Sequence, residues 1–297
     1  MTIKVAIIGT GNIGTDLCSR LIVNKKFEIT AFIGRRPDSD GIKLFRDHIS
    51  GVYTNGLSDL IKCVGEVDCV FDATSAIDHL RHWEEVLKDS QKLVIDLTPS
   101  KVGRPMVPIL SSKLENFNFS YNDMKNFSMV TCGGQSAALL VYAISRNAKE
   151  ISNIEVSSSI ASKSAGPATR RNIDEYISAT ENLVGMISGC SSVKALLVLN
   201  PAEPPVMMRT TVQVSARMFE LDTIKKEVKD LTQELQSYVP GYEIVVAPHE
   251  SQIGVVSATI KVTGAGFYLP KYAGNLDIIN SAAVETANRY FNRIQDE

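Results

Sequence analysis

The sequence lacks the features of membrane, secreted and nucleic-acid-binding proteins. The apolar stretch at its N-terminus, residues 5–8, ends at Gly9 and is too short for a signal peptide or a membrane span. There is no long basic run and no stripe of basic and aromatic residues, and the formal net charge is -2. We therefore expect neither a membrane nor a nucleic acid as a partner.

Cysteine is also scarce, with five residues that show no CxxC pair and no zinc-type spacing. An odd number of cysteines without a secretory signal indicates reduced thiols and predicts a cytoplasmic location. The four histidines contain no recognisable metal motif, so no metal site is predicted. His79 and His82 stand at helical spacing, and we expect surface or helix-capping roles for them. His249 follows a proline in a predicted loop and is a minor candidate for a base near Cys132.

The sequence does contain a change of pattern between its first third and the rest. Short apolar runs first alternate with helix-length stretches, which is typical of a parallel sheet covered on both faces. After about residue 150 the apolar runs become longer and partly alternating, which predicts a mixed or antiparallel sheet with helices on one face. The expected strands are 3–8, 27–34, 67–73, 92–97, 154–161, 194–199, 211–216, 243–246 and 255–262, and the expected helices are 14–23, 79–88, 136–146, 172–187, 223–237 and 275–294.

These elements predict an α/β chain with two domains. We expect a dinucleotide-binding Rossmann domain with a doubly wound parallel sheet at residues 1–130, and an α+β domain at residues 131–274. A C-terminal helix, 275–297, is expected to pack back on the first domain and complete it. The length of 297 residues is sufficient for two domains that each have a core.

A glycine-rich motif follows the first predicted strand. Residues 9–14 read GTGNIG and open a helix, an arrangement that lets a pyrophosphate approach closely and sit at the positive helix end. The residue that binds the ribose should directly follow the second strand. At that position the sequence has Arg35 and Arg36 in place of an acidic residue. Paired arginines would hold a 2′-phosphate, so we predict a preference for NADPH or a tolerance of it. The alternative is that Asp38 or Asp40 binds the ribose and the arginines are solvated.

Hydroxyl residues follow two later strands. Thr74 and Ser75 come after the predicted strand 67–73, and Thr98 and Ser100 come after 92–97. Ligands of parallel sheets bind beyond the carboxyl ends of the strands, so these hydroxyls are candidates to line the cofactor cleft. Helix capping is the alternative role for each of them.

A cysteine stands at the start of a predicted apolar helix. Residues 129–135 read MVTCGGQ, and the positive end of the helix dipole is expected to lower the pKa of Cys132 and favour its thiolate. Neighbouring N–H groups can hold the oxyanion of a tetrahedral adduct, and the two glycines allow a thioester to approach closely. Cys132 is therefore the candidate nucleophile, whereas the other cysteines are expected to be core residues.

Nearly the whole chain resembles the acylating acetaldehyde dehydrogenases. The matching segments are 9–16, 72–76, 96–99, 129–135, 157–167, 172–175, 199–209 and 268–278, of which 160–167 (IASKSAGP) and 200–205 (NPAEPP) are the most specific. The resemblance implies that Cys132 attacks acetaldehyde, propanal or a longer aldehyde, that hydride moves to a nicotinamide cofactor, and that coenzyme A collects the acyl group. It also implies a fold like that of aspartate-semialdehyde dehydrogenase, a homodimer formed through the second domain, and an aldolase partner that channels the aldehyde.

The resemblance and the motifs together assign candidate site residues. Cys132 matches the catalytic thiol. The candidate cofactor-binding residues are Gly9, Gly11, Asn12, Ile13, Gly14, Arg35, Arg36, Thr74, Ser75, Ser162, Lys163, Ser164, Ala165, Gly166, Pro167 and Asn275. The candidate substrate-pocket residues are Gln135, Asn172, Ile173, Thr210 and Ile279.

Three departures from the family pattern modify these expectations. Thr210 stands where the family has an aspartate thought to activate the thiol, so thiolate formation must rest on the helix dipole or on coenzyme A. Arg36 stands where the family usually has an aspartate, which supports the NADPH prediction. The segment between Tyr242 and Phe267 is shorter than in the family, which implies a lost aldolase interface or a reshaped entrance for an acyl carrier.

Three functions follow from the sequence as alternatives. The first is the interconversion of an aldehyde and an acyl-CoA thioester with NAD or NADP. The second is a biosynthetic, NADPH-dependent reduction of a carrier-protein or specialised acyl thioester. The third is a non-catalytic Rossmann protein, which would need the glycines but not Cys132.

Overall fold

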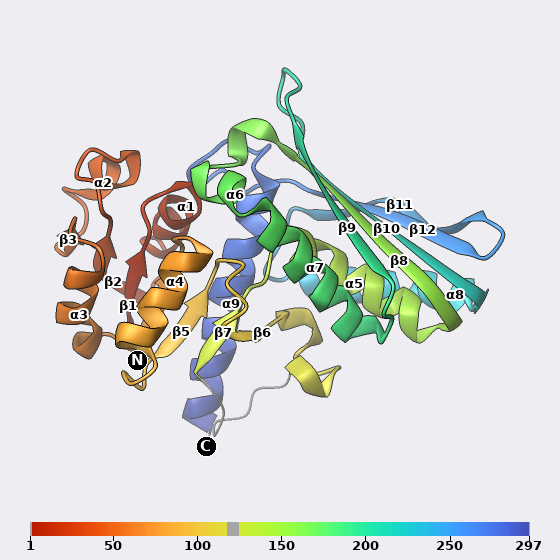
Figure 1. Cartoon of the computed structure of the whole chain (residues 1–297), viewed down its shortest axis with the longest axis horizontal. Coiled ribbons are helices and arrows are strands. Elements are labelled where there is room, and N and C mark those ends of the chain that lie inside the picture. Colours follow the sequence, from red (N-terminus) through yellow and green to blue (C-terminus); the bar gives the residue numbers. More distant parts are fainter. Residues whose placement is uncertain (1, 118–124, 297) are drawn as a thin grey trace.

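The computed structural model describes residues 2–117 and 125–296, and over these residues the chain forms two β-sheets (Figure 1). The first sheet has the strand order β3-β2-β1-β4-β5-β7-β6, and the second has the order β11-β12-β10-β8-β9. The expected first domain, 1–130, contains residues 1 and 118–124, and the expected final helix, 275–297, contains residue 297. These residues lie outside the described part.

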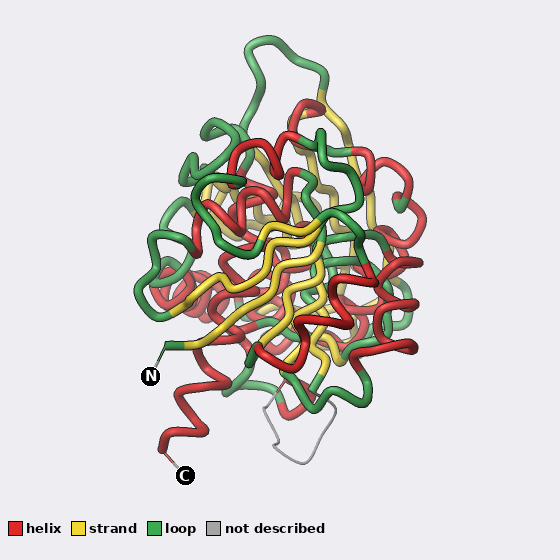
Figure 2. Tube along the Cα trace, turned by 90° about the vertical axis from the view of Figure 1, so that its left-hand side faces the viewer, coloured by secondary structure: helices red, strands yellow, loops and turns green. Residues whose placement is uncertain are grey.

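The strand pairings described in the first sheet are all parallel. Its strands are β1 (Ile3–Ile8), β2 (Phe27–Ile33), β3 (Val52–Tyr53), β4 (Cys69–Asp72), β5 (Leu93–Asp96), β6 (Arg104–Pro105) and β7 (Asn126–Ser128), and its helices are α1 (Asn12–Leu21), α2 (Asp40–Phe45), α3 (Leu57–Cys63) and α4 (Ala76–His82). In β1, Val5 and Ile7 join one hydrophobic cluster, while Ala6 and Ile8 join another. Continuous apolar strands are stable here because helices pack around the sheet (Figure 2).

The strand order creates a crevice at the carboxyl ends of β1 and β4. From β1 the chain moves outward through β2 and β3, then returns to the other side of β1 as β4 and continues to β5. The connections that leave β1 and β4 therefore run in opposite directions. Ligands of doubly wound sheets bind at such a point, so the topology positions a ligand site there.

The second sheet is mixed. β10 is antiparallel to β8 and β12, β11 is antiparallel to β12, and β8 is parallel to β9. The elements are α5 (Cys132–Arg146), β8 (Ala148–Ala161), α6 (Pro167–Arg171), α7 (Ile173–Ser188), β9 (Val193–Asn200), β10 (Met208–Phe219), α8 (Leu221–Leu235), β11 (Tyr242–Gln252) and β12 (Val255–Val262). Helices α5, α7 and α8 pack on one face, where Val156 and Val212 belong to the core. Leu196 and Val198 lie on the opposite face and are exposed.

The C-terminal helix α9 (Gly274–Asp296) connects the two sheets (Figure 1). It contacts α1 and β5 of the first sheet and α5 and β12 of the second. The side-chain amide of Asn280 donates hydrogen bonds to the Ile13 carbonyl oxygen (3.2 Å) and to a carboxylate oxygen of Asp16 (2.8 Å). This helix therefore holds the beginning of α1 against the second half of the molecule.

The predicted fold class, a Rossmann-type parallel sheet beside an α+β mixed sheet, is confirmed. The single helix predicted at 79–88 is wrong, because α4 ends at His82 and a π-helical turn, Trp83–Leu87, follows it. Short 3₁₀ turns occupy Val64–Glu66, Pro108–Leu110, Glu115–Phe117 and Ser162–Ser164. Among the described helices, none is both long and apolar enough to cross a membrane.

Candidate active site

The turn between β1 and α1 requires glycine because it lies directly against the end of β4. Gly9 has a φ of +110°, and a Cβ there would lie 2.4 Å from the carbonyl oxygen of Ala73. A Cβ at Gly14 would lie 1.9 Å from the carbonyl oxygen of Gly9. Gly11 instead faces open space at the start of α1, which has no side-chain cap. This geometry leaves room for a pyrophosphate at the N-terminus of α1.

A cavity of about 510 Å³ lies in front of this turn. It has the size of a cofactor site, and three arginines give it a positive lining that suits an anionic ligand. The predicted cofactor residues that line it are Gly9, Gly11, Arg35, Arg36, Thr74, Ser75 and Pro167, and the other lining residues include Thr10, Asp78, His82, Ala168 and Arg171.

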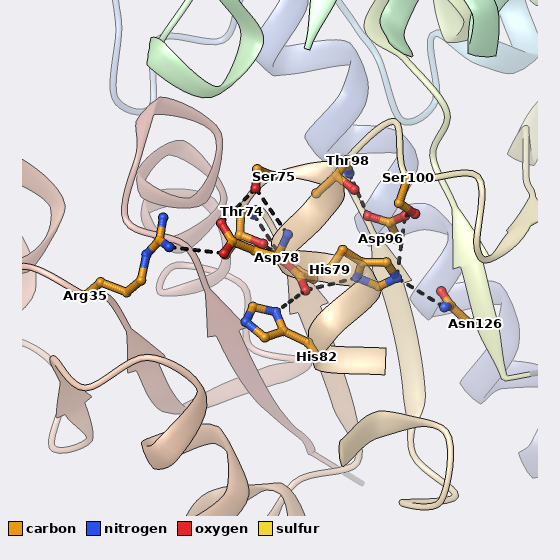
Figure 3. Close-up of polar contacts among 11 residues, drawn as sticks. Arg35, Thr74, Ser75, Asp78, His79, His82, Asp96, Thr98, Ser100 and Asn126 are labelled. Carbon is orange, nitrogen blue, oxygen red and sulfur yellow. Dashed lines mark hydrogen bonds and ion pairs between the residues drawn. The ribbon is translucent and has the colours of Figure 1, made fainter. Parts of the chain in front are cut away.

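The predicted arginines reach this cavity from the turn after β2. Arg35 is mostly exposed, and its Nη1 lies 3.1 Å from Oδ1 of Asp78 (Figure 3). Asp38 and Asp40, the alternative ribose ligands, are not among the residues that line the cavity. The carboxylate that does line it is Asp78, which accepts a hydrogen bond from the hydroxyl of Ser75 (2.7 Å). Ser75 also caps α4, so its two predicted roles coexist.

The two α4 histidines are buried, and the prediction of surface or capping roles for them is wrong. His79 is fully buried and His82 is 6 % exposed. Both rings point to the same side of α4 (Figure 3), and their Nδ1 atoms lie 2.9 Å and 2.7 Å from Oδ2 of Asp72, at the end of β4. Nε2 of His79 lies 3.6 Å from Oδ2 of Asp96, at the end of β5. Their shared partner, Asp72, ends the strand that precedes α4, and helical spacing alone does not reveal this contact. No group of three or more metal-ligating side chains in the described residues has the arrangement of a metal site.

The two buried carboxylates around these histidines have pKa values shifted in opposite directions. Burial raises the pKa of Asp72, but hydrogen bonds and charges from His79 and His82 outweigh it and hold that pKa below its ordinary value. Burial lowers the pKa of His79, but the carboxylates of Asp96 and Asp72 outweigh burial and raise it. Burial raises the pKa of Asp96 to about 6, with His79 opposing the rise.

Each of these carboxylates also organises the turn that follows its own strand. Asp72 Oδ1 accepts hydrogen bonds from the backbone N–H (3.0 Å) and the hydroxyl of Thr74. Asp96 accepts hydrogen bonds from the N–H of Thr98 (2.7 Å) and the hydroxyl of Ser100 (2.6 Å). The cluster therefore fixes Thr74, which lines the cavity described above.

The candidate nucleophile Cys132 is the first residue of α5. The hydroxyl of Thr131 caps this helix by accepting a hydrogen bond from the N–H of Gly134 (2.8 Å). Val130, two residues before Cys132, has a φ of +61°, which is rare for a β-branched residue. The backbone is thus held in an unfavourable conformation where it delivers the cysteine.

The thiol faces a second, smaller cavity of about 60 Å³. The two cavities share Thr74 and Ala168, so they meet at the end of β4. Oδ1 of Asn275 is buried at this cavity and has no hydrogen-bond partner among the described residues. An unpartnered acceptor beside a cleft with a glycine turn fits a nicotinamide dinucleotide. The lining residues are Ile13, Thr74, Leu97, Pro99, Val130, Thr131, Cys132, Ala168, Thr169, Asn172, Tyr176, Asn275 and Ile279.

The prediction of a lowered thiol pKa is wrong for this structure. Burial raises the pKa of Cys132 to about 11, and the Tyr176 phenol and the N–H groups of Gly133 and Cys132 only partly oppose it. The thiol is 8 % exposed, so the cost of placing a charge in this apolar pocket exceeds the benefit of the helix dipole.

The other predicted substrate residues are divided between the cavity and its surroundings. Asn172 and Ile279 line the cavity, whereas Ile173, Gln135 and Thr210 do not. The Gln135 amide donates hydrogen bonds to the carbonyl oxygens of Met106 (2.7 Å) and Met129 (3.0 Å), so it braces the backbone. Thr210 is fully buried and bonds to the hydroxyls of Ser136 (2.7 Å) and Ser158 (3.1 Å). The candidate base His249 is exposed on the edge strand β11 and does not line the cavity.

The predicted segment 162–167 forms the turn that crosses from β8 to α6. The side-chain amide of Asn12 donates a hydrogen bond to the carbonyl oxygen of Ser164 (3.3 Å), which joins this turn to the start of α1. Lys163 pairs with Glu203 on the β9–β10 connection. Pro167 lines the cofactor-sized cavity. Tyr176, on α7, is a pocket residue that the sequence reasoning misses, because its contact with Cys132 spans 44 positions.

Comparisons with known proteins agree with this geometry. Residues 4–117 match the family described as semialdehyde dehydrogenase, NAD binding domain, and residues 132–270 match the family described as prokaryotic acetaldehyde dehydrogenase, dimerisation. The chain is 45% identical over 292 residues to an acetaldehyde dehydrogenase of Spirochaeta aurantia, covering 97% of this chain and 94% of that one. It is 44% identical over 282 residues to an acetaldehyde dehydrogenase of Pectobacterium atrosepticum, covering 95% and 93%.

A solved structure shows the same fold. The crystal structure of aspartate semialdehyde dehydrogenase II from Vibrio cholerae, complexed with ASA, aligns with a TM-score of 0.65 at 13% identity, covering 98% of this chain and 99% of that chain. This likeness concerns the fold alone. The sequence relatives carry the family assignment, because their identity exceeds 40% over nearly the whole chain. The chain therefore belongs to the acetaldehyde dehydrogenase family of enzymes and contains a Rossmann-type domain for a nicotinamide cofactor.

Proposed function

We propose that this enzyme interconverts a short aldehyde and its coenzyme A thioester through a covalent intermediate on Cys132. The observation that carries the proposal is the position of this thiol in a small cavity that meets the cofactor-sized cavity at Thr74 and Ala168. An acyl carbon bonded to the thiol would lie between the nucleophile and the cofactor site. The glycine turn would hold the pyrophosphate at the start of α1, and Asn275 Oδ1 could accept a hydrogen bond from the carboxamide of a nicotinamide ring.

The reaction divides into an addition, an oxidation and a transfer. In the addition, the Cys132 sulfur bonds to the carbonyl carbon and the thiol proton ends on the carbonyl oxygen, which gives a thiohemiacetal. The nicotinamide cofactor supplies the acceptor for the hydride that leaves this carbon, and the hydroxyl proton is released as the thioester forms. Coenzyme A then takes the acyl group and returns the proton to the thiol. The same steps in reverse reduce an acyl-CoA to the aldehyde.

The cavities also support two finer assignments. Arg35 and Arg36 line the cofactor cavity where no carboxylate of the β2–α2 turn does, which supports a preference for NADPH. The volume of about 60 Å³ beside Cys132 supports an acetyl or propionyl group over longer chains.

We further propose that two copies of the chain form a homodimer. The support is the family match of residues 132–270, whose description names dimerisation, and the uncovered face of the second sheet. On that face, the exposed Leu196 and Val198 of β9 pair in register with Ser157 and Ser159 of β8.

The test is a cofactor oxidation assay with the purified protein. NADPH or NADH is mixed with acetyl-, propionyl- or longer acyl-CoA, and the loss of absorbance of the reduced cofactor is followed beside a Cys132→Ala variant. We expect turnover with acetyl- or propionyl-CoA, faster with NADPH, and none in the variant. Turnover that survives in Cys132→Ala would contradict the covalent route. Cofactor binding without turnover on any acyl-CoA would contradict the coenzyme A assignment and direct the search to carrier-protein thioesters.

A further inference from the structure

Among the described residues, the sulfur of the candidate nucleophile has one side-chain hydrogen-bond partner. The phenol oxygen of Tyr176 lies 3.8 Å from Sγ of Cys132, within the range of a hydrogen bond to sulfur. Both residues are buried, and both line the 60 Å³ cavity. Of the thirteen residues that line it, these two alone carry titratable side chains.

The charged residues of the neighbouring elements do not act on this thiol. Asp174 and Glu175, on the same helix as Tyr176, are exposed. Asp277, on α9, pairs with Arg20, and Arg209, on β10, is exposed. The influences on the pKa of Cys132 are burial, the Tyr176 phenol and backbone N–H groups, and they include no charged residue. Cys132 therefore relies on a neutral donor.

The backbone is shaped to admit the phenol. A Cβ on Gly133 would lie 2.1 Å from the phenol oxygen and 2.8 Å from the hydroxyl oxygen of Ser158, so only glycine permits this approach. Ser158 bonds in turn to the hydroxyl of Thr210 (3.1 Å). The phenol is thus held between α5 and a row of buried hydroxyls on the second sheet.

The phenol keeps its proton in this position. Burial raises the pKa of Tyr176 well above its ordinary value, the charged form of Cys132 adds to the rise, and contacts with Ser158 and the Gly133 N–H oppose it. A neutral phenol carries one O–H donor, and a thiolate is the acceptor in this pocket that gains most from it.

We propose that Tyr176 is a second catalytic residue, whose hydroxyl donates a hydrogen bond to the Cys132 sulfur and stabilises the thiolate that forms the carbon–sulfur bond. The inference rests on the proposed function, since it assigns a partner to the same nucleophile. In the addition, the sulfur electron pair forms the bond to the carbonyl carbon, the C=O π pair moves to oxygen, and that oxygen receives the proton that left the thiol. Tyr176 retains its own proton throughout.

The test measures the thiol directly, without turnover. The rate of alkylation of Cys132 by iodoacetamide is determined by mass spectrometry of its peptide from pH 6 to 10 in the wild type and in Tyr176→Phe. Because a hydrogen bond to a charged group is lost, we expect the rate at a given pH to fall about 10- to 100-fold, with its pH profile moved to higher pH. We expect kcat to fall by a similar factor, while the KM for the acyl-CoA changes little.

Two further variants separate this role from a structural one. Tyr142→Phe removes a phenol hydroxyl from α5 that binds Arg146, and we expect it to leave the alkylation profile unchanged. Replacement of Tyr176 by 3-fluorotyrosine keeps the ring and strengthens the donor, so we expect faster alkylation at a given pH. This variant also tests the idea if Tyr176→Phe does not fold.

Alkylation in Tyr176→Phe at the wild-type rate and pH profile would overturn the inference. The failure of the proposed function has a different signature. If Cys132→Ala retains turnover, the covalent route is wrong whatever the alkylation rates are. If Cys132→Ala is inactive while Tyr176→Phe matches the wild type in both assays, the covalent route stands and the role of Tyr176 alone is refuted.

Discussion

At the scale of single residues, Arg36 offers a direct test of cofactor preference. Arg36→Asp replaces a guanidinium that would hold a 2′-phosphate with a carboxylate that repels it and can accept a hydrogen bond from a free ribose hydroxyl. We predict that kcat/KM with NADPH falls about 10- to 100-fold, the equivalent of one charge-assisted hydrogen bond, while kcat/KM with NADH is kept or raised. Initial rates with both cofactors at saturating acyl-CoA measure this.

A matched control is available on the same half of the molecule. Arg81 is an exposed residue of α4 that pairs with Glu85 in the following π-helical turn and does not line the cavity. Arg81→Asp therefore makes the same charge reversal away from the site. An equal loss with NADPH and NADH in Arg36→Asp would refute the phosphate-binding role.

Ile279 lines the cavity beside the thiol, so we predict that its size limits the length of the acyl group bound there. Ile279→Ala removes three carbons from the wall of the 60 Å³ cavity. We predict that kcat/KM for butyryl-CoA rises about 10-fold relative to acetyl-CoA, since one methylene in an apolar pocket contributes about 1–3 kcal/mol to discrimination. Ile278→Ala is the control, because Ile278 is buried next to it on α9 but does not line the cavity. The idea fails if both variants shift chain-length preference alike.

At the scale of elements, the ends of β4 and β5 give the fold a pH dependence. Burial raises the pKa of Asp96 to about 6 from its ordinary 3.8. Between about pH 4 and pH 6 the folded chain therefore holds a proton that the unfolded chain has released, so this group lowers the free energy of unfolding as the pH rises. Above about pH 6, Asp96 causes no further decrease in the free energy of unfolding. Asp72 acts in the opposite sense, because its pKa is lowered: its contribution is present above its ordinary pKa and is lost in acid.

We predict that Asp96→Asn abolishes the decrease in the free energy of unfolding that Asp96 causes as the pH rises. The side-chain oxygen of the asparagine can still accept a hydrogen bond from the Thr98 N–H. The difference in free energy of unfolding, variant minus wild type, should therefore increase by on the order of 2–3 kcal/mol from pH 4 to pH 7. Urea unfolding at several pH values measures the difference, and Asp89→Asn, at an exposed turn, serves as the reference. Parallel pH curves for the wild type and Asp96→Asn would exclude the raised pKa.

The sequence predicts the elements far better than the contacts between them. The strand at 3–8 is predicted with its observed bounds because a buried parallel strand is a continuous apolar run. Strands β3, β6 and β7 are not predicted, because segments of two or three residues are too short to show a hydrophobic periodicity. The glycine turn and Cys132 can be predicted from the sequence, because their chemistry depends on residues that are adjacent in the chain. The burial of His79 beside Asp96 and the approach of Tyr176 to the thiol are set by partners that only the tertiary fold brings near.

At the scale of the whole molecule, the proposed dimer predicts a mass of twice 32.4 kDa in sedimentation. Leu196 and Val198 are exposed on the face of the second sheet opposite its helices. Changing both to lysine should yield a monomer, because charges in the centre of an apolar contact lose their hydration. Ile253→Lys, at the fully exposed β11–β12 turn, is the control and should leave the mass unchanged. A double variant that stays dimeric would place the interface elsewhere.

The shared helix α9 has a consequence for how the enzyme is made. It supplies Asn275 and Ile279 to the thiol cavity and, through Asn280, holds the start of α1. Synthesis proceeds from the N-terminus, so every other described element leaves the ribosome before this helix does. A nascent chain in which both sheets have formed still lacks the residues of α9 that line one side of the cavity beside Cys132. We therefore expect chemistry at Cys132 to begin only after translation has passed through α9, and a chain stalled before this helix to be inactive.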